Sequence, residues 1–85
     1  MVETVFVFIN TELGAEKTIL DELFKIEEVK EAHPLYGVYD IIARVETETM
    51  QELKDTVALK IRRLDEIRST LTMIVINQTP SHARA

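Results

Sequence analysis

One stretch decides the fold: Leu35-Tyr36-Gly37-Val38-Tyr39-Asp40-Ile41-Ile42-Ala43-Arg44-Val45. Because glycine adopts a positive φ without a Cβ clash, Gly37 is expected to be the pivot of a tight turn between two strands. In the apolar run that follows, successive side chains point to opposite faces of a sheet. The stretch therefore predicts a hairpin whose second strand, residues 39–45, lies inside a sheet and carries a single acid, Asp40, at its start.

Length and composition exclude several classes of protein. The chain has 85 residues, a hydrophobic fraction of 46%, a net charge of −5 and no cysteine. Without cysteine there are no disulfides, thiolate metal sites or cysteine nucleophiles, which fits a cytoplasmic protein. No apolar run reaches the roughly 18 residues of a membrane span. The negative net charge repels a phosphate backbone, so direct nucleic-acid binding is not expected.

The elements before the hairpin follow from hydrophobic periodicity. Residues 4–9 are β-branched or aromatic and predict a strand, and residues 10–14 predict a loop. From residue 15 to about residue 26 the apolar residues recur at helical spacing. The apolar side of this helix is formed by Ala15, Ile19, Leu20, Leu23 and Phe24.

The elements after residue 28 complete the pattern. Residues 29–36 predict a strand that contains Pro34, and because proline lacks the N–H of a ladder bond, this strand belongs at a sheet edge. Thr49 and Glu52 have the spacing of a capping box at a helix start. The apolar residues of that helix are Met50, Leu53, Val57, Ile61 and Leu64, with Leu59 off the stripe. Residues 67–76 predict the last strand, residues 1–78 one domain, and residues 79–85 a flexible tail.

The order βαββαβ predicts an α+β fold of the ferredoxin-like type. In this fold a four-stranded antiparallel sheet carries two helices on one face. Right-handed crossovers place the first and third strands in the centre. The proline-containing second strand then lies at an edge, as its composition requires.

The sheet face without helices is predicted to be too apolar for water. The residues expected to face the helices are Val5, Val7, Ile9, Ile41, Ala43, Val45, Leu71, Met73 and Val75. The other face then carries Phe6, Phe8, Ile42, Ile74 and Ile76. Fully burying five such side chains contributes on the order of 7–15 kcal/mol, which equals the stability of a small domain. We therefore expect a homodimer formed through the sheet. The same alternation predicts that Asp40, Arg44, Thr70 and Thr72 lie on or beside this face.

Three segments carry a resemblance to a known family: residues 29–32, residues 36–40 and residues 67–72. Their sequences are Val29-Lys30-Glu31-Ala32, Tyr36-Gly37-Val38-Tyr39-Asp40 and Ile67-Arg68-Ser69-Thr70-Leu71-Thr72. They resemble the effector-binding domain of the Lrp/AsnC transcription regulators, also called the RAM domain. The most specific element is Gly37-x-Tyr39-Asp40 between two strands, followed by Thr70-x-Thr72 in the last strand. The likeness extends from the first strand to about Ile76.

The resemblance implies a function. Domains of this family form dimers through their sheets, assemble into rings that are commonly octamers, and bind an amino acid between neighbouring dimers. Carried over to this chain, the ligand-binding residues are Tyr36, Gly37, Val38, Tyr39, Asp40, Thr70 and Thr72. Backbone N–H groups at the glycine turn would hold a carboxylate, and Asp40 would pair with an α-ammonium. No cofactor or metal is implied.

The chain departs from the family pattern at two points. Full-length members carry an N-terminal helix-turn-helix, whereas this chain begins directly with the first strand. Either a stand-alone effector domain, which the family includes, or a fragment is expected, and Met1 favours the stand-alone domain. Members often have a glycine before the last strand, where this chain has Asp65-Glu66. A stand-alone domain would act through its assembly state or by joining a DNA-binding paralogue.

Two alternatives remain open from the residues. One is an enzyme of the dimeric α+β barrel kind, with His33, Tyr39 or Asp40 as acid and base. Against it, His33 lies in the edge strand, His82 lies in the tail, and no nucleophile and base are suitably spaced. The other is a ligand-free structural dimerisation module, in which Asp40, Thr70 and Thr72 bond only to one another. The prediction is a sensing module and not an enzyme.

Overall fold

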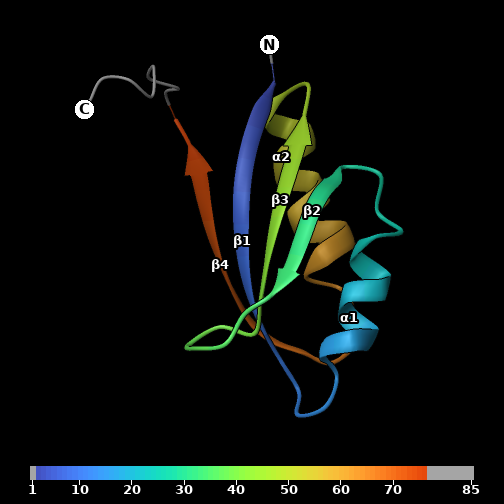
Figure 1. Ribbon diagram of the computed structural model, residues 1–85. Coiled ribbons are helices and arrows are strands. Elements are labelled where there is room, and N and C mark those ends of the chain that lie inside the picture. The colour runs from blue at the N-terminus through green and yellow to red at the C-terminus, as the bar shows by residue number, and fades with distance from the viewer. Residues whose placement is uncertain (1, 77–85) are drawn as a thin grey trace, which may run out of the picture.

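The computed structural model describes residues 2–76, which form a four-stranded antiparallel sheet with helices on one face (Figure 1). The elements are β1 (Glu3–Thr11), α1 (Glu16–Leu23), β2 (Val29–Pro34), β3 (Ile41–Thr47), α2 (Met50–Asp55), a π-helical segment η1 (Thr56–Ile61) that continues α2, and β4 (Ile67–Val75). The strand order is β2-β3-β1-β4. The predicted ferredoxin-like fold is confirmed, with β1 and β3 central and β2 at an edge. The predicted tail, residues 79–85, lies outside the described residues.

The core lies between the sheet and the helices. Alternate residues of the two central strands are fully buried on this side, as predicted: Val5, Val7, Ile9, Ile41, Ala43 and Val45. The helical segments contribute Ile19, Leu23, Leu53, Val57 and Ile61. Phe24 was predicted to lie on the apolar side of the first helix, but this prediction is wrong. α1 ends at Leu23, and the Phe24 side chain is 60% exposed.

The second helix begins with the predicted capping box. The Thr49 hydroxyl accepts a hydrogen bond from the Glu52 N–H (3.1 Å), and the Glu52 carboxylate accepts one from the Thr49 N–H (3.3 Å). Two N–H groups at the helix start are thereby satisfied, which stabilises the helix. Leu59, which falls off the apolar stripe, is 56% exposed as expected. No helix within residues 2–76 is long and apolar enough to cross a membrane.

The faces of β4 are the reverse of the prediction. Thr72 lies opposite Val7 and Ile74 opposite Val5, so both face the helical side, whereas Leu71 lies opposite Phe8 on the other side. Residues directly opposite in an antiparallel pair share a face, and a shift of one position exchanges the faces of a whole strand. The run from residue 71 to residue 76 is apolar at nearly every position, so its own alternation does not distinguish the two registers.

Candidate functional site: the uncovered sheet face and the hairpin

The sheet face without helices carries an apolar patch that covers β1 and β4 and includes Ile42 at the start of β3. Phe6 lies opposite Met73, and Phe8 lies opposite both Leu71 and Ile42. We call these five residues the apolar patch: Phe6, Phe8, Ile42, Leu71 and Met73. Leu71 is 39% exposed and Met73 is 53% exposed, and the other three are half-buried.

The composition of this patch corrects part of the prediction. Phe6, Phe8 and Ile42 lie where they were expected, but Ile74 faces the helical side and Ile76 lies beyond the end of β4. Leu71 and Met73 take the places of the two isoleucines, so the apolar character of the face is kept. Covering the exposed parts of five such side chains contributes on the order of 5 kcal/mol. A contiguous apolar patch of this kind is typical of an interaction surface.

The rest of the same face, along β2 and the later part of β3, is charged. The Arg44 guanidinium contacts Glu31 (2.7 Å between Nη2 and Oε2) and also pairs with Glu46, and His33 Nε2 lies 3.1 Å from Glu31 Oε1. Hydrogen bonds from His33 and Arg44 lower the pKa of the Glu31 carboxyl, and Glu31 in turn raises the pKa of Arg44. The face is therefore divided into an apolar half and an ion-paired half.

The hairpin between β2 and β3 is a six-residue loop, residues 35–40, that projects beyond the sheet (Figure 1). The Leu35 N–H donates to the Asp40 carbonyl (2.8 Å), and the Asp40 N–H donates to the Ile9 carbonyl (3.0 Å). Tyr36 is fully exposed and Val38 is 85% exposed. The loop is thus closed at its base and presents apolar side chains to solvent.

Gly37 does not have the conformation that the sequence suggested. Within the described residues, Gly14 is the glycine with positive φ (81°), and Gly37 is not in that region. A Cβ placed on Gly37 would meet nothing within 4 Å. The longer loop reverses the chain without a left-handed residue at this position, so the fold of one protomer does not require a glycine there.

Asp40 is engaged within the protomer. Its carboxylate Oδ2 accepts a hydrogen bond from the Thr11 N–H (2.9 Å) and lies 3.5 Å from the Thr11 hydroxyl. Thr11 ends β1 and is only 4% exposed. Asp40 therefore ties the end of β1 to the start of β3, a structural role that the sequence did not reveal because the two residues are far apart in the chain.

Tyr39 connects the hairpin to the apolar patch. Its ring centroid lies 5.5 Å from that of Phe8, with the ring planes at 52°. This separation and tilt are typical of favourable aromatic pairs. The exposed hairpin and the apolar patch thus form one continuous surface.

Thr70 and Thr72 do not meet the hairpin on one face. Thr70 lies opposite Ile9 and Thr72 opposite Val7, which places both on the helical side. The prediction that they lie on the uncovered face is wrong, because the register with β1 decides the direction of their side chains. Within one protomer the seven predicted ligand-binding residues do not converge on a single pocket.

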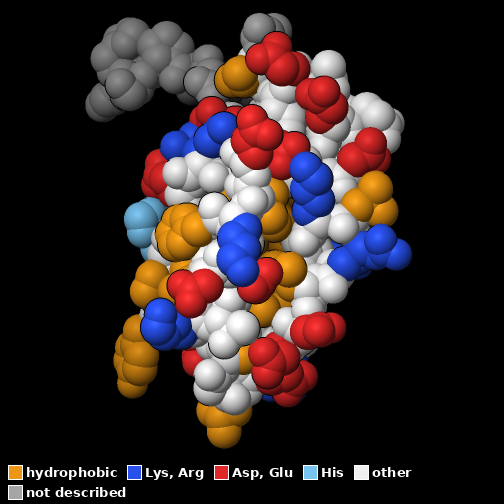
Figure 2. Space-filling view, turned by 90° about the vertical axis from the view of Figure 1, so that its right-hand side faces the viewer, with side chains coloured by type: hydrophobic (Ala, Val, Ile, Leu, Met, Phe, Trp, Pro, Cys, Tyr) orange, Lys and Arg blue, Asp and Glu red, His pale blue; other side chains and the backbone are white. Residues whose placement is uncertain are grey.

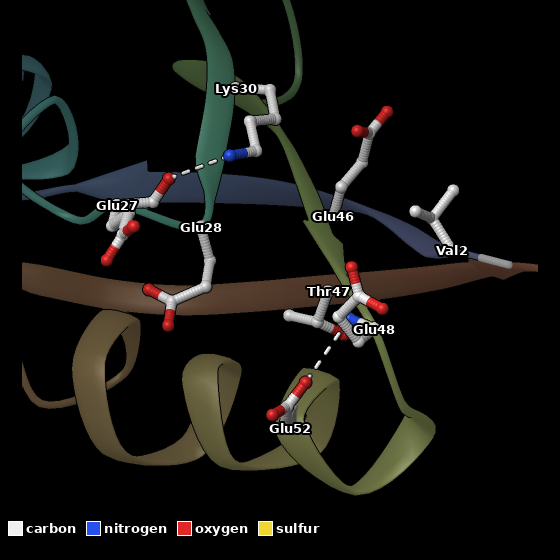
Figure 3. A pocket seen from close by; sticks show the side chains of 8 residues that line it. All are labelled: Val2, Glu27, Glu28, Lys30, Glu46, Thr47, Glu48 and Glu52. Atoms are coloured by element: carbon white, nitrogen blue, oxygen red, sulfur yellow. Dashed lines mark hydrogen bonds between the residues drawn. The ribbon is translucent and has the colours of Figure 1, made fainter.

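A hollow lies at the end of the sheet opposite the hairpin (Figure 3). This hollow has a volume of about 410 Å³ and is lined by Val2, Glu27, Glu28, Lys30, Glu46, Thr47, Glu48 and Glu52. Several of its polar groups are satisfied locally: Lys30 donates to the Glu27 carbonyl (3.1 Å), and Glu52 accepts from the Glu48 N–H (3.2 Å). Within residues 2–76 no three acidic, histidine or cysteine side chains are placed to hold a metal ion.

The surface that carries α1 shows no continuous basic region in its described part (Figure 2). Basic side chains are interspersed with acidic ones, and two lysines of this helix and its exit are paired, Lys17 with Asp21 and Lys25 with Glu22. A nucleic-acid interface requires a clustered positive surface. This side of the molecule does not provide one.

Comparison with known proteins identifies the class. The family described as "Lrp/AsnC ligand binding domain" matches residues 4–84. Regulatory protein AsnC of Haemophilus influenzae is 41% identical over 56 residues, which are 66% of this chain and 37% of that protein. The chain spans less than half the length of the curated relatives it matches.

Several solved structures have the same fold as this chain. FFRP-DM1 is 42% identical, with a TM-score of 0.84 over 87% of this chain and 99% of that chain. Hypothetical protein PHS023 from Pyrococcus horikoshii is also 42% identical, with a TM-score of 0.84 over 92% of this chain and 93% of that chain. AsnC of E. coli is 29% identical, with a TM-score of 0.85 over 93% of this chain and 54% of that chain.

Fold and comparisons together define a ferredoxin-like domain of a ligand-binding type. The chain belongs to the Lrp/AsnC family, as the match over residues 4–84 shows. This family and the matched relatives are regulators and not enzymes, in agreement with the predicted function class. The alternative of a dimeric α+β barrel enzyme finds no support in them.

Proposed function

We propose that this domain is an amino-acid-sensing assembly module, which forms a dimer through the apolar patch and binds its effector between dimers. The observation that carries the proposal is the continuous surface of patch and hairpin, joined by the contact of Tyr39 with Phe8. Membership of a family described by ligand binding supports the sensing role. The structure of a Neisseria meningitidis regulator with the same fold, 14% identical, is a complex of that protein with L-Met.

The effector site is proposed to need more than one protomer. The hairpin residues Tyr36, Gly37, Val38, Tyr39 and Asp40 lie at one end of the molecule, and Thr70 and Thr72 face the helical side. A ligand that contacts both groups would take the hairpin from one protomer and the threonines from another. Effector binding would then shift the assembly by its difference in affinity for the assembled and separate states.

The wider role follows from this mechanism. The assembled form is proposed to be a ring, commonly an octamer in this family, in the cytoplasm. The domain would signal through its assembly state or by entering mixed oligomers with a DNA-binding Lrp/AsnC paralogue. The ligand-free alternative keeps one specific observation in its favour, because the Asp40 carboxylate is already bonded to Thr11.

The dimer face is tested with matched Phe→Asp substitutions. Phe8→Asp places a charge in the apolar patch, whereas Phe24→Asp places one on a 60% exposed residue of the helical side. Light scattering on a sizing column should show a monomer for Phe8→Asp and the wild-type mass for Phe24→Asp. Met73→Asp, at a more exposed patch position, serves as the second variant if Phe8→Asp does not fold. A wild-type mass for both patch variants would contradict the proposed face.

Sensing is tested by thermal shift with the twenty amino acids. Ligand at about 100 times its Kd stabilises the bound protein by about 2.7 kcal/mol, which raises the Tm of a domain of this size by roughly 10 °C or more. The D-enantiomer of each hit is the control. If no amino acid changes either the Tm or the mass, the ligand-free dimer module replaces the sensing function.

A further inference from the structure

A cluster of ion-paired side chains borders the apolar patch on the uncovered sheet face. Glu31 is at its centre, because its Oε2 lies 2.7 Å from Arg44 Nη2 and its Oε1 lies 3.1 Å from His33 Nε2. Arg44 also pairs with Glu46. We call these four residues the ion-paired cluster: Glu31, His33, Arg44 and Glu46. One oxygen of the Glu31 carboxylate thus contacts a permanent cation, and the other contacts a side chain that titrates.

The ion-paired cluster and the apolar patch are neighbours on the same face. His33 lies opposite Ile42, and Ile42 lies opposite Phe8, so the three side chains form one row across β2, β3 and β1. Neighbouring strands are about 4.8 Å apart, so His33 lies one strand beyond the patch. A second sheet that covers Phe8 and Ile42 would therefore reach His33 and Glu31 as well.

Water surrounds much of the ion-paired cluster in one protomer. The His33 side chain is 62% exposed and that of Glu31 is 49% exposed, whereas the side chains of Arg44 and Glu46 are 27% and 30% exposed. At such exposure water screens the charges, and each pair contributes little to stability. A partner sheet would remove this water, and the net charge of the cluster would then decide the cost of covering it.

The net charge of the cluster depends on His33. Hydrogen bonds from His33 and Arg44 lower the pKa of the Glu31 carboxyl, which keeps Glu31 ionised at neutral pH. Two carboxylates and one guanidinium leave the cluster with one negative charge when the imidazole is neutral, and a proton on His33 balances it. In a dimer that covers two such clusters, the unbalanced state leaves a net charge in each, and like charges oppose association.

The other charged side chains at this end of β2 and β3 bond elsewhere. Lys30 donates to the Glu27 carbonyl, and the Asp40 carboxylate accepts from the Thr11 N–H. α1 packs on the other side of the sheet, so its charges do not face His33 (Figure 1). Within residues 2–76, the ion pair that His33 forms is the one with Glu31. A proton on His33 therefore acts mainly on the charge balance of the ion-paired cluster.

We propose that His33 makes formation of the sheet-to-sheet dimer dependent on pH, because the ion-paired cluster accepts a second sheet more readily when His33 carries a proton. This regulation rests on the proposed dimer through the apolar patch. A histidine gains its proton between about pH 8 and about pH 5. The dimer would bind this proton more firmly than the free protomer does, so the added stability of the dimer is present at the acidic end of this range and is lost as the pH rises.

The test measures the dissociation constant of the full chain by sedimentation equilibrium at about pH 8 and about pH 6, in about 0.15 M salt. Carboxylates titrate near pH 4 and stay ionised over this range. Complete uptake of one proton would correspond to a tenfold change in the constant for each pH unit. Because each of two protomers takes up only part of a proton, the Kd should be roughly tenfold lower at the lower pH.

Three variants assign the effect. His33→Gln keeps a hydrogen-bond donor beside Glu31 but cannot gain a proton, so its Kd should be the same at both pH values. His82→Gln changes the other histidine of the chain and should keep the wild-type pH dependence. Glu31→Gln removes one of the two negative charges, so its dimer should already be tight at the higher pH and should not tighten with acid.

The dimer face and its regulation fail in different ways. A chain that stays monomeric at both pH values overturns the two together. A wild-type dimer that weakens or stays unchanged at the lower pH overturns only the regulation, as does an equal change of Kd in the wild type and His33→Gln. If His33→Gln does not dimerise, Glu31→Gln decides, because a wild-type pH dependence in that variant contradicts the role of the cluster charge.

Discussion

Replacement of Asp40 distinguishes a structural carboxylate from a purely ligand-binding one. In Asp40→Ala the Thr11 N–H, in a residue only 4% exposed, loses the acceptor that lies 2.9 Å away. A hydrogen bond to a charged acceptor contributes about 1.5–3 kcal/mol, and an unsatisfied buried N–H costs about 1–3 kcal/mol. We expect Asp40→Ala to lower the free energy of unfolding by about 2 kcal/mol. Asp40→Asn keeps an acceptor oxygen and should cost less than about 1 kcal/mol.

The assay is urea unfolding followed by circular dichroism, repeated at several protein concentrations because self-association adds to apparent stability. Asp55→Ala is the matched control, since among the described residues the Asp55 carboxylate accepts a side-chain hydrogen bond only from Gln51, on an exposed helical surface. It should change the free energy by less than about 0.5 kcal/mol. The reasoning is refuted if Asp40→Ala unfolds at the same urea concentration as Asp55→Ala. In that case the carboxylate would be free to act on a ligand alone.

Three further predictions concern the backbone and pH. Gly14→Ala should lower the free energy of unfolding by about 1–2 kcal/mol, because Gly14 has a φ of 81°. The free energy of unfolding of Gly37→Ala, measured by urea unfolding, should lie within about 0.5 kcal/mol of the wild-type value. Glu66 has a φ of 71°, so Glu66→Gly should raise the free energy of unfolding by about 0.5 kcal/mol. This gain is the backbone strain that glycine relieves, reduced by the conformational entropy that glycine adds to the unfolded chain. The hydrogen bond from Lys60 lowers the pKa of Glu28 below its usual 4.5, so this pair stabilises the fold above that pH and loses its effect as the pH falls through the lowered pKa. Urea midpoints measured between about pH 6 and about pH 3 should therefore fall less in Lys60→Gln than in the wild type, and equal slopes would contradict the pairing.

The sequence was sufficient for the architecture because its local signals agree with one another. The capping box of Thr49 and Glu52 marks a helix start, and Pro34 marks an edge strand. Buried alternation in β1 and β3 identified the core face correctly. These features depend on neighbours within a few residues, and such neighbours are visible in the sequence.

The features that the sequence did not reveal depend on contacts between distant segments. The direction of Thr72 follows from its pairing with Val7 and not from the β4 sequence, which is apolar on both faces. The bond between Thr11 and Asp40 joins residues 29 positions apart. Glu66 adopts a left-handed conformation in the Asp65-Glu66 turn, where members of the family often have a glycine. In each case tertiary structure decided what local preference left open.

Asp40 supports the hairpin that the proposed function requires. Its bond to Thr11 fixes the base of the loop, together with the bond from the Leu35 N–H to the Asp40 carbonyl. The loop so held presents Tyr36 and Val38 to solvent, which contributes nothing to the stability of one protomer. A rigid support for exposed apolar side chains is useful only when something else contacts them, because preorganisation lowers the entropy cost of binding. We therefore propose a positioning role for Asp40, and we propose that the exposed loop residues carry out the recognition. Gly37→Ala then becomes the informative variant, since it should leave stability unchanged and alter assembly or the effector response.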